Sequence, residues 1–321
     1  MTNQLSLGID LGGTNTSFGI VDANGCILVK DTMPTTGHDT IEDYIATLKI
    51  KLSPLFERVG KENIIGAGIG APNGNFYTGE IVFAPNLPWH GVIPLAKLVS
   101  EALLLKTTVT NDAKAAAVGE MKYGAAKGMK DFIMVTLGTG LGSGFIANGQ
   151  IIYGHDGLAG ELGHTIAVRD GRKCNCGRLG CLERYASATG IVITAEEWLE
   201  ERYDETILKT NKGKITAKLI HEAADQGDAL ALELYEFTAK ILAQSLADAI
   251  AITSPQAIIL FGGLAKSGEL LMAPLRRHLE ENLLSIYKNK VAILHSALQD
   301  ADAAILGASA LVNLYPTQKI N

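Results

Sequence analysis

One pattern of strands and turns occurs twice in this chain of 321 residues. In each copy an apolar run leads into a glycine-rich turn, a second apolar run follows, and an Asn-Gly dipeptide opens a third run. Asn-Gly between apolar runs is typical of a tight β-hairpin. A duplicated strand unit followed by helices predicts two similar α/β domains with a ligand-binding cleft between them. The expected strands are residues 5–10, 17–22, 26–30, 132–137, 143–147 and 150–153.

Helices and further strands follow each copy. Apolar residues recur at helical spacing over residues 40–59 and along a long helix that stops before Pro255. We expect a smaller α/β domain, residues 1–112 with about 300–321, and a larger one, residues 113–299, that carries a metal-binding loop. The other expected helices are 113–123 and about 301–315, and the other expected strands are 64–69, 107–110, 257–261 and 291–294.

Both glycine-rich turns are suited to binding phosphate. Backbone N–H groups can point at a phosphate where glycine permits unusual dihedral angles and close approach. Asp10 is placed to hold a Mg²⁺-bound water, and Thr14 to donate its hydroxyl to a phosphate oxygen. Either turn alone also fits an ordinary hairpin, but the repetition favours a shared polyphosphate ligand. The residues that would hold it are Asp10, Gly12, Gly13, Thr14, Gly138, Thr139 and Gly140.

A candidate metal site lies between Glu161 and Glu183, where one histidine and three cysteines fall within eighteen residues. Zn²⁺ prefers four tetrahedral thiolate and imidazole ligands, so this set would close its shell and make the metal structural. A disulfide or a chance cluster is the alternative, but Cys-x-Cys is too short for an easy bridge. The remaining cysteine, Cys26, is expected in the apolar core. The predicted ligands are His164, Cys174, Cys176 and Cys181.

The charge balance and the absence of certain segments exclude several classes of protein. A net charge of −6 and a pI near 5.7 argue against a nucleic-acid surface, which needs a basic face. No stretch approaches the roughly twenty apolar residues that a membrane helix needs. The N-terminus enters an apolar strand without the features of a signal peptide, and free cysteines fit a reducing compartment. We therefore expect a cytoplasmic protein with no nucleic-acid or membrane partner.

Six motifs are spread over nearly the whole chain. They are Asp10-x-Gly-Gly-Thr14, Asn111-Asp112-Ala113, Gly138-Thr-Gly140, Glu161-x-Gly-His164, the cysteine cluster ending at Glu183, and Gly262-Gly263. Together they resemble the ROK family of sugar kinases (repressor, open reading frame, kinase), within the actin-like ATPase superfamily. The resemblance implies two actin-like ATPase (ribonuclease H-like) domains facing across a central cleft. It also implies Mg²⁺ and ATP as phosphoryl donor, adenosine beside Gly262 and Gly263, and a homodimer.

The resemblance further implies a hexose site. A sugar ring presents many hydroxyl groups, so its pocket needs carboxylates, amides and imidazoles. Asp112 would be the general base that accepts the proton of the attacking hydroxyl. Without the surrounding motifs, the same residue would more simply cap the following helix. The implied sugar-binding residues are Asn86, Asn111, Asp112, Glu161, His164 and Glu183, with His164 serving both zinc and sugar.

Two positions depart from the family pattern. Lys114 stands where family members usually have asparagine, which puts one contact of the first helical turn in question. Asn73 stands where glycine is usual, and asparagine tolerates left-handed dihedral angles, so we expect this turn to persist. In the nearby Asn-Leu-Pro-Trp loop, Trp89 either packs on the sugar or fills the domain core.

The activity implied is ATP-dependent phosphorylation of the 6-hydroxyl of glucose, because residues 86–89 resemble glucokinases of the family. Alternatives with the same chemistry are an N-acetylmannosamine or N-acetylglucosamine kinase and a fructokinase. A different class is a non-catalytic sugar-sensing regulator, which in this family carries an added DNA-binding module. Because the phosphate motif starts at Asp10, it leaves no room for that module, and the acidic charge also favours the enzyme.

Overall fold

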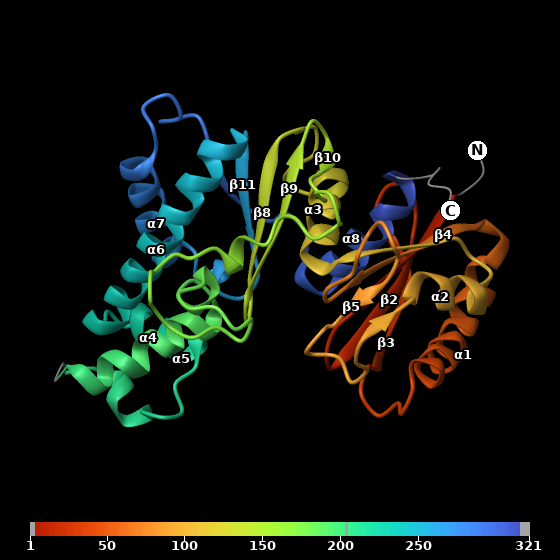
Figure 1. Ribbon diagram of the computed structural model, residues 1–321, viewed down its shortest axis with the longest axis horizontal. Helices are drawn as coiled ribbons and strands as arrows, with labels where there is room; N and C mark the ends of the chain where they lie inside the picture. Colours follow the sequence, from red (N-terminus) through yellow and green to blue (C-terminus); the bar gives the residue numbers. More distant parts are fainter. Residues whose placement is uncertain (1–3, 203–204, 315–321) are drawn as a thin grey trace.

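The computed structural model describes residues 4–202 and 205–314 and divides them into two lobes (Figure 1). A five-stranded sheet forms the centre of the first lobe, in the order β3-β2-β1-β4-β7. The first strand pairs antiparallel with the second and parallel with the fourth. These strands are β1 (Leu5–Leu11), β2 (Asn15–Val21), β3 (Ile27–Pro34), β4 (Ile64–Ala71) and β7 (Thr107–Asn111).

The second lobe repeats this topology. Its strands are β8 (Phe132–Leu137), β9 (Leu141–Ala147), β10 (Gln150–Ile151), β11 (Ala257–Phe261) and β12 (Ala292–His295). They are ordered β10-β9-β8-β11-β12, with β8 antiparallel to β9 and parallel to β11. Strand for strand this is the order of the first sheet, so the predicted duplication of an α/β unit is confirmed.

Burial along the strands follows their place in the sheets. The central strands β1 and β8 are buried on both faces, as strands covered by helices are. The edge strand β3 is mostly exposed or partly exposed. In the second lobe the hairpin turn at Asn148 and Gly149 has φ angles of +52° and +75°, the left-handed pair that a two-residue type I′ turn requires.

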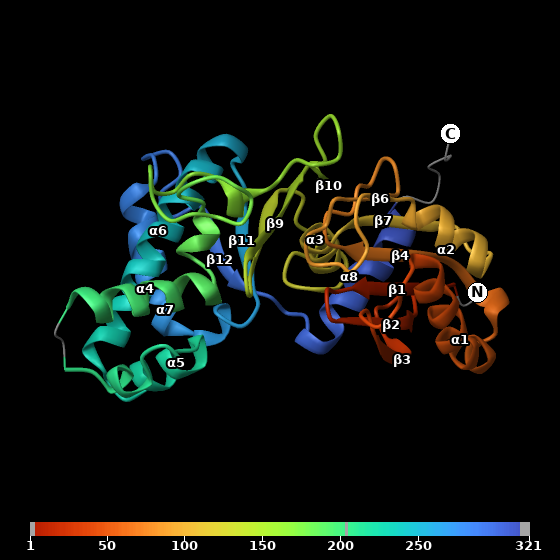
Figure 2. The same ribbon diagram turned by 60° about the horizontal axis from the view of Figure 1, so that its bottom comes forward.

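Helices cover both sheets (Figures 1 and 2). They are α1 (Ile41–Val59), α2 (Leu95–Leu103), α3 (Asp112–Tyr123), α4 (Ala188–Glu201), α5 (Ala217–Asp225), α6 (Ala229–Thr253), α7 (Glu269–Asn282) and α8 (Asp300–Leu314). Short 3-10 turns are η1 (Lys61–Asn63), η2 (Leu162–His164), η3 (Leu182–Arg184), η4 (Ile207–Asn211) and η5 (Ala265–Ser267), and a small hairpin joins β5 (Ile81–Val82) to β6 (Val92–Ile93). The predicted helix 301–315 corresponds to α8, and residues 315–321 lie outside the described residues.

Two helices, α3 and α8, lie between the two sheets in both ribbon views (Figures 1 and 2). Glycines let backbones approach where these helices pack. A Cβ atom on Gly8 of β1 would overlap the carbonyl oxygen of Ile305, and one on Gly68 of β4 would overlap that of Ala308. Side chains at these glycines would therefore push α8 off the first sheet.

The helices α3 and α8 also meet each other through glycine. A Cβ atom on Gly119 would lie 2.9 Å from the Cα of Gly307, closer than real atoms approach. The chain crosses between the lobes twice, through α3 and the loop after it and through the segment between β12 and α8. Glu120 joins these crossings, because its carboxylate accepts hydrogen bonds from the Ala125 N–H and the Ser296 hydroxyl.

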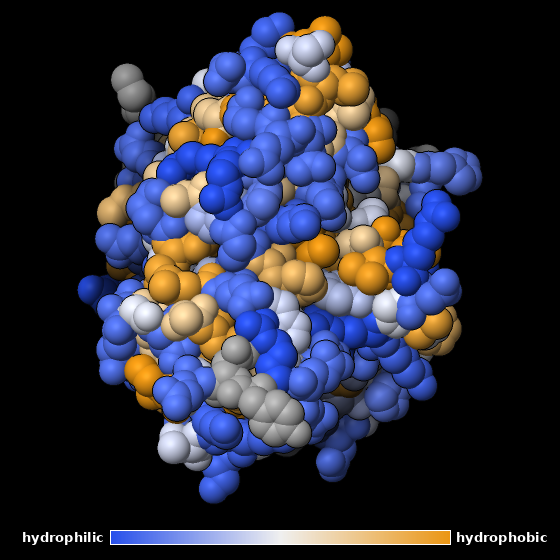
Figure 3. All heavy atoms as spheres, turned by 90° about the vertical axis from the view of Figure 1, so that its left-hand side faces the viewer, coloured by the Kyte–Doolittle hydropathy of each residue, from blue (hydrophilic) through white to orange (hydrophobic). Residues whose placement is uncertain are grey.

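The outer face of the second lobe is mainly hydrophilic. Figure 3 views the outer face of this lobe, on which hydrophobic residues are scattered among polar ones. No described helix combines the length and the apolar character that crossing a bilayer would require.

One expectation about the core is wrong. Cys26 is exposed, although the sequence suggested a core position in a strand. It belongs to the hairpin turn before β3, where its N–H donates to the carboxylate of Asp22 (2.8 Å). The apolar run begins one residue later, so the cysteine projects from a turn and not from the sheet.

We predict that Gly68→Ala will destabilise the protein by about 3 kcal/mol, because the added methyl group overlaps the backbone of α8 and the core must shift. Thermal and urea unfolding will measure the loss. Gly263→Ala is the matched control, since a Cβ atom there meets open space and φ is not in the left-handed region. Equal stability of the two variants would show that α8 does not need the glycine.

Candidate active site

The carboxyl ends of the parallel strands β1, β4 and β7 meet at one edge of the first sheet. Asp10 pairs with Gly70 in the register of β1 and β4, and Asn111 pairs with Ala71. A Cβ atom on Gly70 would lie 3.5 Å from the Cα of Asp112 and 3.9 Å from an Asp10 carboxylate oxygen. Two carboxylates predicted to be functional therefore flank one glycine, at the sheet edge where α/β proteins bind ligands.

Asn111, and not Asp112, caps α3. The side-chain oxygen of Asn111 accepts hydrogen bonds from the N–H groups of Ala113 (3.0 Å) and Lys114 (3.3 Å). Asp112 is the first helical residue, and one of its oxygens accepts from the Ala113 N–H (2.8 Å). The purely structural role considered for Asp112 is thus filled by its neighbour, and a second carboxylate oxygen remains for chemistry.

The electrostatic surroundings disfavour charge on both aspartates. The surrounding protein raises the pKa of Asp10 to about 7, and the nearby charge of Asp112 adds to the effect. The pKa of Asp112 is also raised by the loss of bulk water around it, an effect that its hydrogen bond from Ala113 opposes. Asp112 is nevertheless exposed at the surface, so the carboxyl group does not lie in a closed cavity. Its pKa is raised because protein replaces much of the water around it.

The first phosphate-turn candidate touches the loop that carries Asn86. Gly12 and Gly13 join β1 to β2, and the N–H of Gly12 donates to the Asn15 carbonyl (3.0 Å). A Cβ atom on Gly13 would lie 2.7 Å from the carbonyl oxygen of Asn86. The exposed side chains of Thr14 and Asn86 are therefore held close to this turn.

The second turn touches a residue predicted to bind sugar. A Cβ atom on Gly140 would lie 2.8 Å from a carboxylate oxygen of Glu183, so Gly138, Thr139 and Gly140 adjoin the acceptor side. The carbonyl of Gly138 accepts from the N–H of Ala188, at the start of α4. Both glycine turns thus contact residues of the sugar set.

Gly262 and Gly263 follow β11. Gly262 has φ of +101°, and a Cβ atom there would lie 2.7 Å from the Leu137 carbonyl oxygen, so only glycine fits beside the end of β8. A groove of about 400 Å³ opens beside Gly262 and is also lined by Lys266, His295 and Gln299. Gly262, one of the two residues predicted to approach adenosine, therefore lies at the rim of a groove next to the second predicted phosphate turn.

The four predicted metal ligands gather in one place. The ligand atoms of His164, Cys174, Cys176 and Cys181 all lie within 4.8 Å of one another. The Cys174 sulfur is 3.7 Å from His164 Nδ1, and the Cys176 and Cys181 sulfurs are 3.6 Å apart. A Zn–S bond of about 2.3 Å gives a tetrahedral edge of about 3.8 Å, so these spacings fit Zn²⁺.

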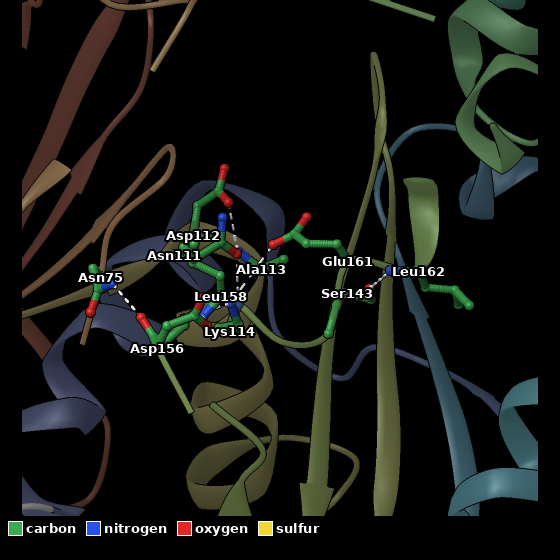
Figure 4. A network of polar contacts seen from close by, with 12 residues as sticks. Asn75, Asn111, Asp112, Ala113, Lys114, Ser143, Asp156, Leu158, Glu161 and Leu162 are labelled. Atoms are coloured by element: carbon green, nitrogen blue, oxygen red, sulfur yellow. Dashed lines mark hydrogen bonds and ion pairs between the residues drawn. The ribbon is translucent and has the colours of Figure 1, made fainter. Parts of the chain in front are cut away.

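Glu183 lies beside this cluster and Glu161 lies apart from it. The Cys174 sulfur is 3.0 Å from Glu183 Oε1, and His164 Nδ1 is 3.8 Å from the same oxygen. Glu161 instead forms an ion pair with Lys114 (3.7 Å), and Figure 4 shows its side chain extending toward the first turn of α3. The residues of the predicted sugar set therefore come from four places: the loop between β5 and β6, the end of β7, the cysteine cluster and the residue before η2.

Trp89 fills the core of the first lobe. It is buried in the same hydrophobic cluster as Tyr44, and the two ring centroids are 4.8 Å apart. Of the two roles considered for Trp89, the structure thus shows core packing. The Asn73 turn persists as expected, because Asn73 has φ of +51° and its amide donates to the carbonyls of Val82 and Phe83.

Comparison with protein-family models identifies the family of this chain. The ROK family model matches residues 6–314. The chain belongs to the ROK family. A glucokinase of Halalkalibacterium halodurans is 37% identical to this ROK protein over 320 residues, 97% of this chain and 96% of the relative. An N-acetylmannosamine kinase of Escherichia coli is 31% identical over 309 residues, 95% and 97% of the two chains.

A solved structure supports the fold. The crystal structure of a ROK family glucokinase from Streptomyces griseus, in complex with glucose and AMPPNP, has a TM-score of 0.80 to the ROK protein at 32% identity. The match covers 97% of this chain and 99% of that chain. The predicted fold class, two actin-like ATPase domains, is therefore confirmed.

One residue not predicted from the sequence, Arg172, joins the cysteine loop to helix α4. Arg172 donates from Nε to both carboxylate oxygens of Glu197 on α4 (3.0 Å each), and its guanidinium lies 4.4 Å from the Tyr185 ring centroid. A single arginine in a polar loop gives no signal for such a contact. In the sequence Lys114 stands out only as a departure from the family pattern. A lysine among four alanines in the first turns of a helix is nevertheless a signal that its ammonium group has a buried partner.

We predict that Asp10→Asn will stabilise the ROK protein at pH 8 in Mg²⁺-free buffer by about 1 to 3 kcal/mol. Because folding raises the pKa of Asp10 from 3.8 to about 7, wild-type stability falls as pH rises through that window, and asparagine removes this loss. Unfolding at pH 5 and pH 8 will measure the effect, which should shrink at pH 5. A difference independent of pH would contradict the assignment to Asp10.

Proposed function

We propose that this ROK protein is an ATP-dependent hexose kinase with glucose as its principal acceptor. The observation that carries the proposal is the placement of Asp112. It is the first residue of α3, while Asn111 caps the helix, and it lies beside Asp10. The same helical turn carries Lys114, which forms an ion pair with Glu161. The 37% identity to a glucokinase and the fold shared with a glucose-bound and AMPPNP-bound glucokinase support the same reaction.

Asp112 acts as the general base. Its carboxylate accepts the proton of the sugar 6-hydroxyl while that oxygen attacks the γ-phosphorus of ATP in line with the departing ADP oxygen. A raised pKa suits this role, because a base works best when its pKa approaches the working pH. Glu161, Glu183, His164, Asn86 and Asn111 supply the acceptors and donors that orient the ring.

The nucleotide lies along the glycine turns. The turns at residues 12–14 and 138–140 offer their remaining N–H groups to the phosphates, since the N–H of Gly12 already donates to Asn15 and that of Gly138 to Gly140. Gly262 with Gly263 allows adenosine to approach the second lobe. Asp10 would hold Mg²⁺ through a bound water, and the ion would neutralise charge that develops on the phosphates.

The cysteine cluster binds structural zinc. Four ligands complete the shell, so the metal takes no part in the chemistry and fixes the loop instead. Because Nδ1 of His164 faces the sulfurs, its other ring nitrogen is left for the sugar. The metal thereby holds His164 and Glu183 in one geometry.

We also propose the assembly and setting. Residues 1–112 with those from about 300 form the smaller domain and residues 113–299 the larger, with α3 packed against both sheets. The protein acts in the cytoplasm as a homodimer, without nucleic-acid or membrane partners.

A second acceptor deserves a direct comparison, because the N-acetylmannosamine kinase of Escherichia coli is 31% identical over almost the whole chain. Because this identity is lower than the 37% identity to the glucokinase, N-acetylmannosamine is the second candidate acceptor. Initial rates with glucose, fructose, N-acetylmannosamine and N-acetylglucosamine separate these activities, and a higher kcat/KM for any of the last three would displace glucose.

The proposed activity predicts ADP formation from Mg·ATP that depends on glucose, measured in a coupled assay. Asp112→Asn should lower kcat by roughly 10²- to 10⁴-fold, the usual contribution of a general base, and leave glucose affinity within a few-fold of wild type. Its melting temperature should not fall below that of wild type, because Asn111 still caps α3 and the raised pKa of Asp112 means that its charge does not stabilise the fold.

Two outcomes would count against the proposal. Near-normal turnover of Asp112→Asn would remove Asp112 from the reaction. A wild-type protein that binds sugar but forms no ADP with any hexose would instead be a sugar-sensing regulator.

Metal analysis should find one zinc per chain. Cys181→Ser removes a buried ligand and should lose the metal and weaken glucose binding at least tenfold, with nucleotide binding changed less. Cys26→Ser is the matched control, because Cys26 is exposed and outside the cluster. Calorimetric titrations with glucose and AMPPNP will measure both affinities, and unchanged glucose affinity in the metal-free variant would disprove the link.

A further inference from the structure

The segment between β10 and η2 carries Glu161 into the sugar site, and the first lobe holds it from one side (Figure 4). The Asn75 side-chain amide donates to the Asp156 carbonyl (2.6 Å), and the Tyr77 hydroxyl donates to the Gly154 carbonyl (3.0 Å). These bonds join the loop before β5 to a segment of the second lobe. Glu161 therefore sits at the end of a segment that both lobes fix.

Ser143 fixes the backbone on both sides of Glu161. Its hydroxyl donates to the Gly160 carbonyl (2.6 Å) and accepts from the Leu162 N–H (3.1 Å). The side chain of Glu161 remains 51% exposed, and its rotatable bonds leave the carboxylate free to turn. A carboxylate that must receive one hydroxyl in one direction needs a further restraint.

Lys114 supplies that restraint from the first turn of α3. Its ammonium group lies 3.7 Å from Glu161 Oε1 and donates to the Gly157 carbonyl (3.4 Å), and its side chain is only 2% exposed. A buried ammonium group has few possible partners, so it draws the nearby carboxylate toward it. In Figure 4 Glu161 extends toward this turn, which also carries Asp112.

The charges around Lys114 show why a cation is useful there. Burial lowers the pKa of the Lys114 ammonium group, and the nearby charges of Glu161, Asp112 and Asp156 oppose that shift. Without a positive charge these carboxylates would repel one another, and Glu161 would turn outward into solvent. The Glu161 carboxylate offers hydrogen-bond acceptors, which suits it to a sugar hydroxyl.

We propose that Lys114 is a positioning residue of the sugar site, whose ammonium group holds the Glu161 carboxylate in the orientation that accepts a hydrogen bond from a hexose hydroxyl. The inference rests on the proposed hexose kinase function. Lys114 acts through Glu161 and not by touching the sugar. Its loss should therefore weaken sugar binding while the phosphoryl transfer machinery stays intact.

The first test is Lys114→Met in the full zinc-loaded chain, since methionine keeps most of the buried stem and removes the charge. We expect the KM for glucose to rise about tenfold, with kcat and the KM for ATP within about threefold of wild type. Lys122→Met is the matched control: Lys122 lies in the same helix, over the Tyr123 ring at 5.0 Å, and is not part of the site. Its KM for glucose should not change.

A double-mutant cycle tests whether Lys114 acts through Glu161. Glu161→Gln removes the charge that the ammonium group holds, so adding Lys114→Met to it should raise the KM for glucose by less than about twofold. A purely structural lysine would give the same tenfold increase in both backgrounds. That additive result, or a glucose KM of Lys114→Met within twofold of wild type, would overturn the proposal.

Two further measurements keep the inference separate from the proposed activity. Calorimetric titration with glucose compares the same variants without turnover, so a protein that binds glucose but fails to phosphorylate it refutes the kinase and still decides the role of Lys114. A wild-type protein that binds no hexose refutes both. If Lys114→Met does not fold, Lys114→Leu removes the same charge with another apolar side chain, and the same tenfold loss is expected.

Discussion

The close approach of α8 to the first sheet and of α3 to α8 is the constraint on which this molecule depends. Gly8 and Gly68 allow the backbone of α8 to pack directly against β1 and β4. Gly119 and Gly307 allow α3 and α8 to pack directly against each other. These contacts bring the two sheets to either side of one helix pair. Asp112, the first residue of α3, takes its position beside Asp10 from this packing.

Backbone contact through glycine is repeated at the site itself. Gly13 lies against the carbonyl of Asn86, and Gly140 against the carboxylate of Glu183, so each predicted phosphate turn contacts a residue of the predicted sugar set. Larger residues at these turns would push the two apart. The glycines therefore serve packing, in addition to the phosphate binding proposed for them.

The sequence predicted features with a local signal. Repeated apolar runs and turns gave the strands of both sheets and their duplication, and the spacing of His164 and the cysteines gave a cluster that the structure assembles. Features that depend on distant contacts escaped prediction. Trp89 packs against Tyr44, and the partners of Lys114 come from a loop more than forty residues away. Cys26 was misplaced for a local reason, because the hairpin turn extends one residue further than the apolar run suggested.

The joint made by Glu120 has a mechanical consequence. Because one carboxylate binds both the Ala125 N–H after α3 and the Ser296 hydroxyl before α8, the two covalent links between the lobes are fastened to each other. They form a single joint, and any rotation of one lobe against the other would turn about that point. Residues far from the joint would travel farther than Asp112, which lies on the same helix as Glu120.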